Sequence, residues 1–195
     1  MATMEKTSVI QEVKYAIKLE GVSPLVMNNN SGIGEDKGRD PGAYEMEHFR
    51  ERCYTDAAGA LLIPARAIKK ALVNACKFMV KKPRGVAFKS YGPFIEAATI
   101  VAHDAVLNVT MDKVIAFTTV VNLDPSKGPK GPRGPRTRPM LPLPWLATTE
   151  LLVFDAILSE EVLAEIAERA GKQVGFLDGR SIDFGRALVS ITKLS

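Results

Sequence analysis

The first clear pattern along the chain is an alternation of apolar and polar residues. From Val13 to Leu19, apolar side chains occupy every second position, which is the period of a β-strand with one buried face. Farther along, residues 150–158 are almost continuously apolar and predict a largely buried strand. Residues 187–193 predict a final strand.

Two segments carry the period of an amphipathic helix. The first, residues 64–81, begins with Pro64, a favoured residue at the start of a helix, and separates an apolar face from a basic one. The cations of the basic face are Arg66, Lys70, Lys77 and Lys81. For the second helix, residues 160–170, Ser159 is a good N-cap and Gly171 is the expected stop. A shorter helix is expected over residues 44–53.

The remaining segments connect these elements. Residues 21–43 read as a long polar loop, and residues 86–121, rich in Val, Ile, Thr and Phe, predict several short strands. With a short apolar strand at residues 60–63, the order is strand, helix, strands, helix, strand. This order predicts an α+β fold: a ferredoxin-like (RRM-like) βαββαβ sheet with loop and strand insertions and helices on one face. We expect one domain over residues 1–195.

The composition is that of an ordinary globular protein, with 46% hydrophobic and 25% charged residues among 195. No apolar run reaches the roughly 18 residues that a membrane-spanning helix needs, and the first residues lack the apolar stretch of a secretory signal. Two cysteines, Cys53 and Cys76, make no disulfide framework. We therefore expect a cytoplasmic protein with reduced thiols and no membrane partner.

Positive charge is concentrated in one segment. Residues 127–136 read KGPKGPRGPR, and in polyproline II, which has three residues per turn, their cations would line one edge. These cations are Lys127, Lys130, Arg133 and Arg136, and Arg138 adds a fifth. The net charge of the chain is +4, so the rest of the chain is slightly acidic. We expect a basic Gly/Pro-rich insertion over residues 122–145 that contacts a polyanion; the alternative is a flexible, solvated loop.

Two further features favour a polyanionic partner. No carboxylate occurs between Asp56 and Glu96, so the basic helix face lacks acidic partners. The glycine-rich loop at 175–186 combines backbone amides with Arg180 and Arg186, a combination that cradles phosphate. It matches neither the G-x-G-x-x-G nor the Walker A pattern, so we expect no nucleotide cofactor. The alternatives are a solvated helix face and a tight turn with glycines at positive φ.

Metal and nucleophilic chemistry find little support in the sequence. His48, His103 and the two cysteines lack zinc-ligand spacing, and no G-x-S-x-G or comparable nucleophile signature is present. We expect no cofactor, no metal and no catalytic residue. The weak candidates for cleavage of a phosphodiester are Asp36 and Asp40, in the loop after the first strand, where a carboxylate is more often a turn residue.

Three segments together resemble the RAMP superfamily, the ferredoxin-fold proteins that include the backbone subunits of CRISPR effector complexes. They are residues 21–25, residues 62–72 (LIPARAIKKAL, similar to the family's I-P-G-S-S-L-K-G-x-L-R) and the glycine-rich loop with the strand at 175–189. Residues 65–67 depart from the family's Gly-Ser-Ser step. The resemblance implies guide or target RNA held along the sheet and loops, and head-to-tail stacking of subunits.

A closer likeness is to uncharacterised proteins of phages and prophages. The shared segments are PLVMNN at 24–29, the helix start at 61–65, RTRP at 136–139 with Trp145, and the loop at 175–186. This likeness implies a fold and leaves the activity open.

The sequence therefore predicts a non-catalytic protein that binds single-stranded RNA or DNA and coats the strand as a homo-oligomer, a filament or a subunit of a nucleoprotein complex. The residues expected to contact phosphates are Arg66, Lys69, Lys70, Lys77, Lys81, Lys127, Lys130, Arg133, Arg136, Arg138, Arg180 and Arg186. Two alternatives stay open. One is a phage-encoded assembly factor that docks on a partner through the Pro-rich segment 138–145, and the other is an endoribonuclease that uses Asp36 or Asp40.

Overall fold

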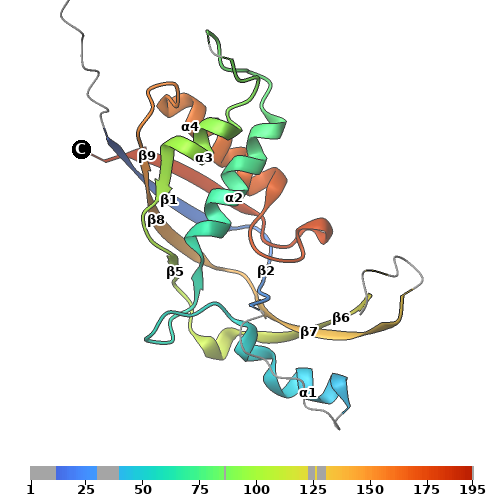
Figure 1. Ribbon diagram of the computed structural model, residues 1–195. Helices are drawn as coiled ribbons and strands as arrows, with labels where there is room; N and C mark the ends of the chain where they lie inside the picture. The colour runs from blue at the N-terminus through green and yellow to red at the C-terminus, as the bar shows by residue number, and fades with distance from the viewer. Residues whose placement is uncertain (1–11, 30–39, 86, 123–125, 127–130, 195) are drawn as a thin grey trace, which may run out of the picture.

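The computed structural model describes residues 12–29, 40–85, 87–122, 126 and 131–194 (Figure 1). Within these residues β1 (Val13–Gly21) is an inner strand of the main sheet, and β8 (Leu146–Val153) and β9 (Ala187–Lys193) flank it on either side, both antiparallel to it. β4 (Thr99–Val101) and β5 (Ala105–Leu107) pair with the other edge of β8, and β3 (Leu62–Ile63) pairs with β5.

The strand order is that of a ferredoxin-like fold. If β4 and β5 together count as the second core strand, β8 as the third and β9 as the fourth, the core strands are paired in the order second, third, first, fourth. In the described part of the chain, three α-helices lie between the first and second core strands, and the longest of them is α2 (Ala65–Ala75); α4 (Glu160–Arg169) lies between the third and fourth. The predicted α+β, ferredoxin-like sheet is therefore confirmed.

The helices cover one face of this sheet. The odd-numbered residues of β1 point to the helix side and are largely buried, as alternation predicted, and α3 (Gly92–Ala98) packs beside α2 (Figure 1). The buried residues of this core include Ile17, Leu19, Ile68, Leu72, Leu163 and Ile166. Ser159 caps α4 as predicted, because its side chain accepts from the N–H of Val162.

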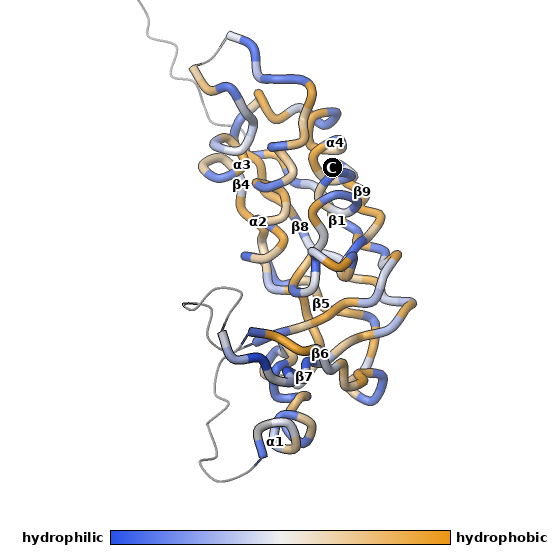
Figure 2. The backbone as a smooth tube through the Cα atoms, turned by 90° about the vertical axis from the view of Figure 1, so that its right-hand side faces the viewer, coloured by the Kyte–Doolittle hydropathy of each residue, from blue (hydrophilic) through white to orange (hydrophobic). Residues whose placement is uncertain are grey.

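A second, smaller sheet extends from one end of the main sheet. It has the order β2-β7-β6, with β2 at Leu25–Val26, β6 at Ile115–Asn122 and β7 at Arg133–Leu141. α1 (Pro41–His48) and the 3-10 turn Phe49–Arg52 lie against β7. Figures 1 and 2 place the β6–β7 ribbon and α1 at one end of the molecule and the loop between α2 and α3 at the other.

The described part of the basic tract is β-strand, which corrects the polyproline II expectation. The β6–β7 ladder places residues 133–136 opposite residues 119–122. Prolines fit this strand because Pro135 and Pro139 are each two residues from Thr137, so their backbone nitrogens point to the same side of β7 as the N–H of Thr137. That N–H points away from β6 and toward a side chain of α1. The prolines' missing N–H groups therefore cost the ladder no hydrogen bond.

Several boundaries differ from those that the sequence predicted. The helix expected over 64–81 ends at Ala75 and passes into a 3-10 turn, Cys76–Phe78, before the chain reaches Pro83, which disfavours helix in the residue before it. α3 takes part of the region expected to be strands, since Pro93 suits the first turn of a helix. The loop predicted at 21–43 contains β2 and the start of α1.

Gly171 does not end α4. The chain continues through a π-helical turn, Ala170–Val174, and the helix stops at Gly175, whose φ is +77°. Gly171 serves packing instead, because a Cβ at this position would lie 2.2 Å from the carbonyl oxygen of Ala187 on β9. A glycine is what allows the end of α4 to approach the sheet this closely.

Candidate nucleic-acid interface

The turn between β4 and β5 positions the start of α2. The N–H of Ala65 donates to the carboxylate of Asp104 at 2.7 Å, so Asp104 supplies the cap that the Pro64 side chain lacks. The first turn of α2 is thereby fixed. Arg66 and Lys70 follow on one face, one turn apart, and both are exposed.

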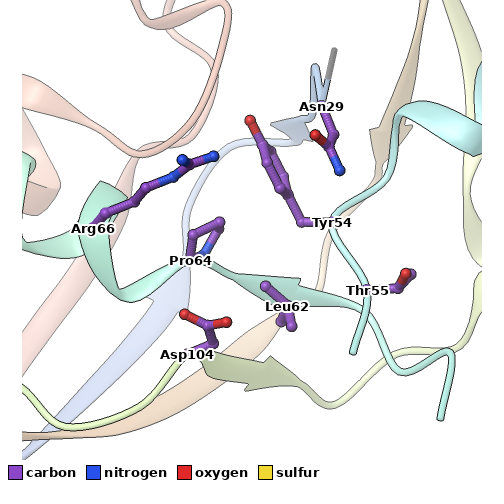
Figure 3. A pocket seen from close by; sticks show the side chains of 7 residues that line it. All are labelled: Asn29, Tyr54, Thr55, Leu62, Pro64, Arg66 and Asp104. Atoms are coloured by element: carbon purple, nitrogen blue, oxygen red, sulfur yellow. The ribbon is translucent and has the colours of Figure 1, made fainter. Parts of the chain in front are cut away.

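Two cavities open beside these cations, and Tyr54 lines both of them. One has a volume of about 340 Å³ and is lined by Arg66 and Asn29, among others (Figure 3). The second, of about 240 Å³, is lined by Lys70, Asn28 and Arg180. We call the combined depression the central groove, defined by Asn28, Asn29, Tyr54, Arg66, Lys70 and Arg180.

Tyr54 lies in the middle of the central groove. Its hydroxyl donates to the backbone carbonyl of Asn28 at 3.2 Å, which fixes the orientation of the ring. In Figure 3 the hydroxyl end of Tyr54 and the guanidinium of Arg66 point toward one another. A half-buried aromatic ring beside cations is the combination that stacks bases and neutralises phosphates in proteins that bind single strands.

The two carboxylates of the groove are already engaged in the fold. Asp104 caps α2, and Asp178 forms an ion pair with Arg138, with 3.1 Å between Oδ2 and Nε. Among the described residues, no ion pair involves Arg66, Lys70 or Arg180. The central groove is therefore electropositive, and its three cations remain available to an anionic ligand.

The lysines that follow along α2 divide between fold and surface. Lys69 turns toward the sheet, where its ammonium donates to the carbonyl of Thr99. Lys77 is exposed at the end of the helical segment and donates to the side chain of Asn74 at 3.1 Å. Lys81 is exposed beyond the helix. Arg66 and Lys70, together with Lys69, also line a further depression of about 410 Å³ between α2 and α3.

The arginines of β7 lie close to the groove but have acidic partners. Arg136 and Arg138 are two residues apart and share one face of the strand. Arg136 pairs with Glu45 of α1 at 2.8 Å, and Arg52, which is buried, approaches the same carboxylate at 3.4 Å. Burial, followed by the proximity of Arg136, lowers the pKa of the Arg52 guanidinium, and Glu45 opposes this shift. Three arginines thus share two carboxylates here.

The glycine-rich loop uses its backbone amides within the fold. The N–H of Phe176 donates to Gly185, that of Asp178 to Val26, and that of Gly185 to Pro24. The loop therefore has the conformation that the sequence left open as an alternative, a tight turn with Gly175, Gly179 and Gly185 at positive φ. What the loop contributes to the groove is the Arg180 side chain. Arg186 instead braces the loop, because its guanidinium donates to the carbonyl of Arg180 at 3.1 Å.

Among the other predicted site residues, Arg133 is exposed on the β6–β7 ribbon and does not line the groove. Lys127, Lys130 and Asp36 lie outside the described residues. Asp40 has a structural contact, since its carboxylate accepts from the N–H of Ala43 at 2.9 Å and caps α1.

Trp145 does not form the exposed end of a docking segment, as the assembly-factor alternative expected. It is buried against Gly21, and its indole N–H donates to the carbonyl of Ser23 at 2.9 Å. The chain between Pro142 and Pro144 stays accessible, but its aromatic anchor belongs to the core.

No group of three or more His, Cys, Asp or Glu side chains within the described ranges is placed to hold a metal ion. Cys53 and Cys76 are buried free thiols, and burial raises their pKa values to about 11 and about 12. No helix in the same part of the chain is long and apolar enough to cross a membrane.

Sequence reasoning missed Tyr54, Asn28 and Arg52. Tyr54 reaches the groove because a tight turn at 56–59 pairs its segment with the start of β3: Thr55 bridges Leu61, and the N–H of Leu62 donates to the carbonyl of Tyr54. Asn28 and Asn29 are polar residues directly after an apolar run. This change from apolar to polar is the sequence signal that could have pointed to them as groove residues.

Comparison with protein-family models finds no match, and comparison with curated protein sequences finds none either. Comparison with solved structures finds a chain of the Type III-B Cmr-beta bound to cognate target RNA, with a TM-score of 0.62 and 10% sequence identity over 95% of this chain. This chain spans 61% of the length of that one. Cmr6 from Pyrococcus furiosus matches with a TM-score of 0.45 and 14% identity, over 91% of this chain and 97% of that one. At this identity the first likeness concerns the fold, and it agrees with the strand order described above.

Proposed function

We propose that this protein binds single-stranded RNA without cleaving it, as a subunit of a nucleoprotein complex, and that the strand passes through the central groove. The observation that carries the proposal is the convergence of Arg66, Lys70 and Arg180 around Tyr54. These cations come from α2 and from the glycine-rich loop, which are far apart in the chain.

The groups in the groove match the two parts of a nucleotide. Guanidinium and ammonium groups bind phosphate oxygens, and they do so in any sequence. The Tyr54 ring offers a surface for a base, and the amides of Asn28 and Asn29 can donate to or accept from base edges and ribose hydroxyls. RNA is favoured over DNA because the fold is shared with a chain from a complex bound to target RNA.

Coating of the strand by several copies, or assembly with other subunits, is part of the proposal. A single groove holds few phosphates, and single-strand binders gain affinity when neighbouring copies share one strand. The mass of the purified protein by size-exclusion chromatography and its A260/A280 ratio would report oligomer size and bound nucleic acid together.

The test replaces the three groove cations. Arg66→Gln, Lys70→Gln and Arg180→Gln combined should weaken binding of a fluorescent RNA strand in anisotropy measurements. The slope of log K against log salt should fall by about 2, at about 0.7 per phosphate contact. The matched control replaces three exposed cations elsewhere, Lys14, Lys113 and Lys172, by Gln. Equal losses in both variants would show non-specific attraction and refute the groove.

A further inference from the structure

The loop between α2 and α3 exposes apolar side chains that the central groove does not explain. Phe78 is 49% exposed, Val80 81% and Phe88 53%. Figure 1 shows this loop reaching beyond the helices, at the end opposite to the β6–β7 ribbon. We call the described residues 77–85 and 87–91 the tip. Large apolar side chains gathered at an exposed projection are the mark of a binding surface.

The tip is also strongly basic. Its cations are Lys77, Lys81, Lys82, Arg84 and Lys89, all of them exposed. No carboxylate occurs in the chain between Asp56 and Glu96, so the acidic partners that an ordinary surface would interleave are missing from this stretch. Each exposed aromatic residue of the tip is next to a cation in the sequence, Phe78 to Lys77 and Phe88 to Lys89.

The aromatic side chains have defined surroundings. Phe88 meets Phe94 of α3 edge to face, with ring centroids 5.4 Å apart, and Phe94 packs against the core. Phe78 belongs to the 3-10 turn that ends the α2 segment. Phe78 thus lies on a 3-10 turn, and Phe88, in the loop, is oriented by its contact with Phe94. Both rings keep about half of their surface exposed, which is what a stacking platform requires.

A line of cations connects the tip with the central groove. Arg66 and Lys70 lie about 40° apart on α2, at 100° per residue, and Lys77 follows in the 3-10 turn beyond the end of α2. All three are exposed. With rises of about 1.5 Å per residue in the helix and about 2 Å in the turn, Arg66 and Lys77 are separated by about 17 Å along the axis. A single strand that leaves the groove along α2 would pass these cations in turn and then reach the rings of Phe78 and Phe88.

A surface that is both basic and apolar fits three classes of partner: an anionic membrane, an acidic protein or a nucleic acid. The continuous cation line favours the nucleic acid, because neither a membrane nor a folded protein would need a charged path into the groove. The chemistry agrees, since a ring next to a cation contacts a base and its phosphate together. A membrane contact would instead depend mainly on Val80, the most exposed apolar side chain of the tip.

We infer that the tip is a second subsite for the same single strand, in which Phe78 and Phe88 stack on bases while the surrounding lysines and arginine contact phosphates. This inference rests on the proposed function of the central groove and assigns the tip to the strand that leaves it. It predicts that long strands bind more tightly than short ones, and that the gain depends on bases and on aromatic rings.

The experiment compares strands of about 4 and about 16 nucleotides, which bracket the site sizes of compact single-strand binders, with a long strand whose outer half is abasic. For the wild-type protein we expect the intact long strand to bind about 10-fold more tightly than the half-abasic one, within the range of base stacking. Phe78→Leu with Phe88→Leu keeps apolar side chains but removes both rings, and it should abolish this preference while leaving the salt slope unchanged. Val80→Ser is the matched control and should bind like the wild type.

Each other outcome has a definite meaning. Unchanged base preference in the Phe→Leu variant would overturn the inference, and so would an equal loss in Val80→Ser, which would indicate apolar docking. Tighter binding to vesicles rich in phosphatidylserine than to RNA would overturn it in favour of a membrane. If even the short strand fails to bind the wild type, the proposed function fails first; if short and intact long strands bind equally, the tip alone is refuted.

Discussion

Glu45 on α1 and Arg136 on β7 form an ion pair, with 2.8 Å between Oε1 of Glu45 and Nε of Arg136. The other carboxylate oxygen of Glu45 accepts from the backbone N–H of Thr137 at 2.7 Å. One acidic side chain thus joins a helix to the ribbon and neutralises an arginine that the sequence assigned to phosphate binding. Arg136 therefore stabilises the fold before it is available to a ligand.

Glu45→Gln should destabilise the protein by about 2 to 3 kcal/mol. The change leaves the buried Arg52 beside Arg136 without their shared carboxylate. Urea denaturation measures the effect. Glu96→Gln, at an exposed position on α3, is the control and should stay within about 0.5 kcal/mol of the wild type. Similar losses of stability in both variants would mean that the contacts of Glu45 with Arg52 and Arg136 stabilise the fold no more than an exposed carboxylate does.

A ribbon variant should be built without changing Arg136. Lys127→Gln, Lys130→Gln and Arg133→Gln together leave the Glu45 pair intact, so the protein should keep its unfolding midpoint. If these cations contact the strand, the salt slope of RNA binding should fall by up to about 2. Adding Arg136→Gln should then lower stability as well. Unchanged RNA binding in the triple variant would show that these three cations do not contact the strand.

Gly185→Ala should unfold at clearly lower denaturant than Gly59→Ala. Both glycines have positive φ, +70° and +83°, so both substitutions share a backbone cost of about 1 to 2 kcal/mol. A Cβ at Gly185 would also lie 2.0 Å from the carbonyl oxygen of Phe176, whereas nothing lies within 4 Å of one at Gly59. The difference between the two midpoints isolates this close approach, and equal midpoints would contradict it.

Stability should decline in alkaline solution between about pH 9 and pH 12. Burial raises the pKa values of Cys53 and Cys76 from 9.0 to about 11 and about 12. The folded state therefore retains thiol protons that the unfolded state releases, so the stability present below pH 9 is lost as the pH rises. Denaturant midpoints across this range would show the decline. Cys76→Ala should flatten it, and a slope that persists unchanged would point to other groups.

Asp36→Ala and Asp40→Ala test the endoribonuclease alternative. With labelled RNA and Mg²⁺, both variants should give the same products as the wild type. Asp40→Ala should also lose about 1 kcal/mol of stability, because it removes the cap of α1. If the wild type cleaves the RNA and a folded Asp40→Ala variant does not, the result supports the endoribonuclease alternative.

The sequence by itself determined the elements whose patterns are local. Alternation in residues 13–19 placed β1, Ser159 and the apolar period after it placed α4, and residues 187–193 placed β9 at the bounds observed. Such patterns are reliable because a helix or half-buried strand repeats its environment every few residues. From their order followed the ferredoxin-like topology, and from their charges the basic face of α2.

The tertiary structure alone decided which conformation the Gly-Pro tract takes and which cations keep their charge exposed. Residues 133–141 are strand because β6 supplies hydrogen-bond partners that no local repeat announces. Lys69, Arg136 and Arg138 contact groups that are distant in the chain, namely Thr99, Glu45 and Asp178. Arg66, Lys70 and Arg180 meet instead around Tyr54. A cation's partners are set by the folded chain's long-range contacts, and these are the part of the structure that residue spacing cannot encode.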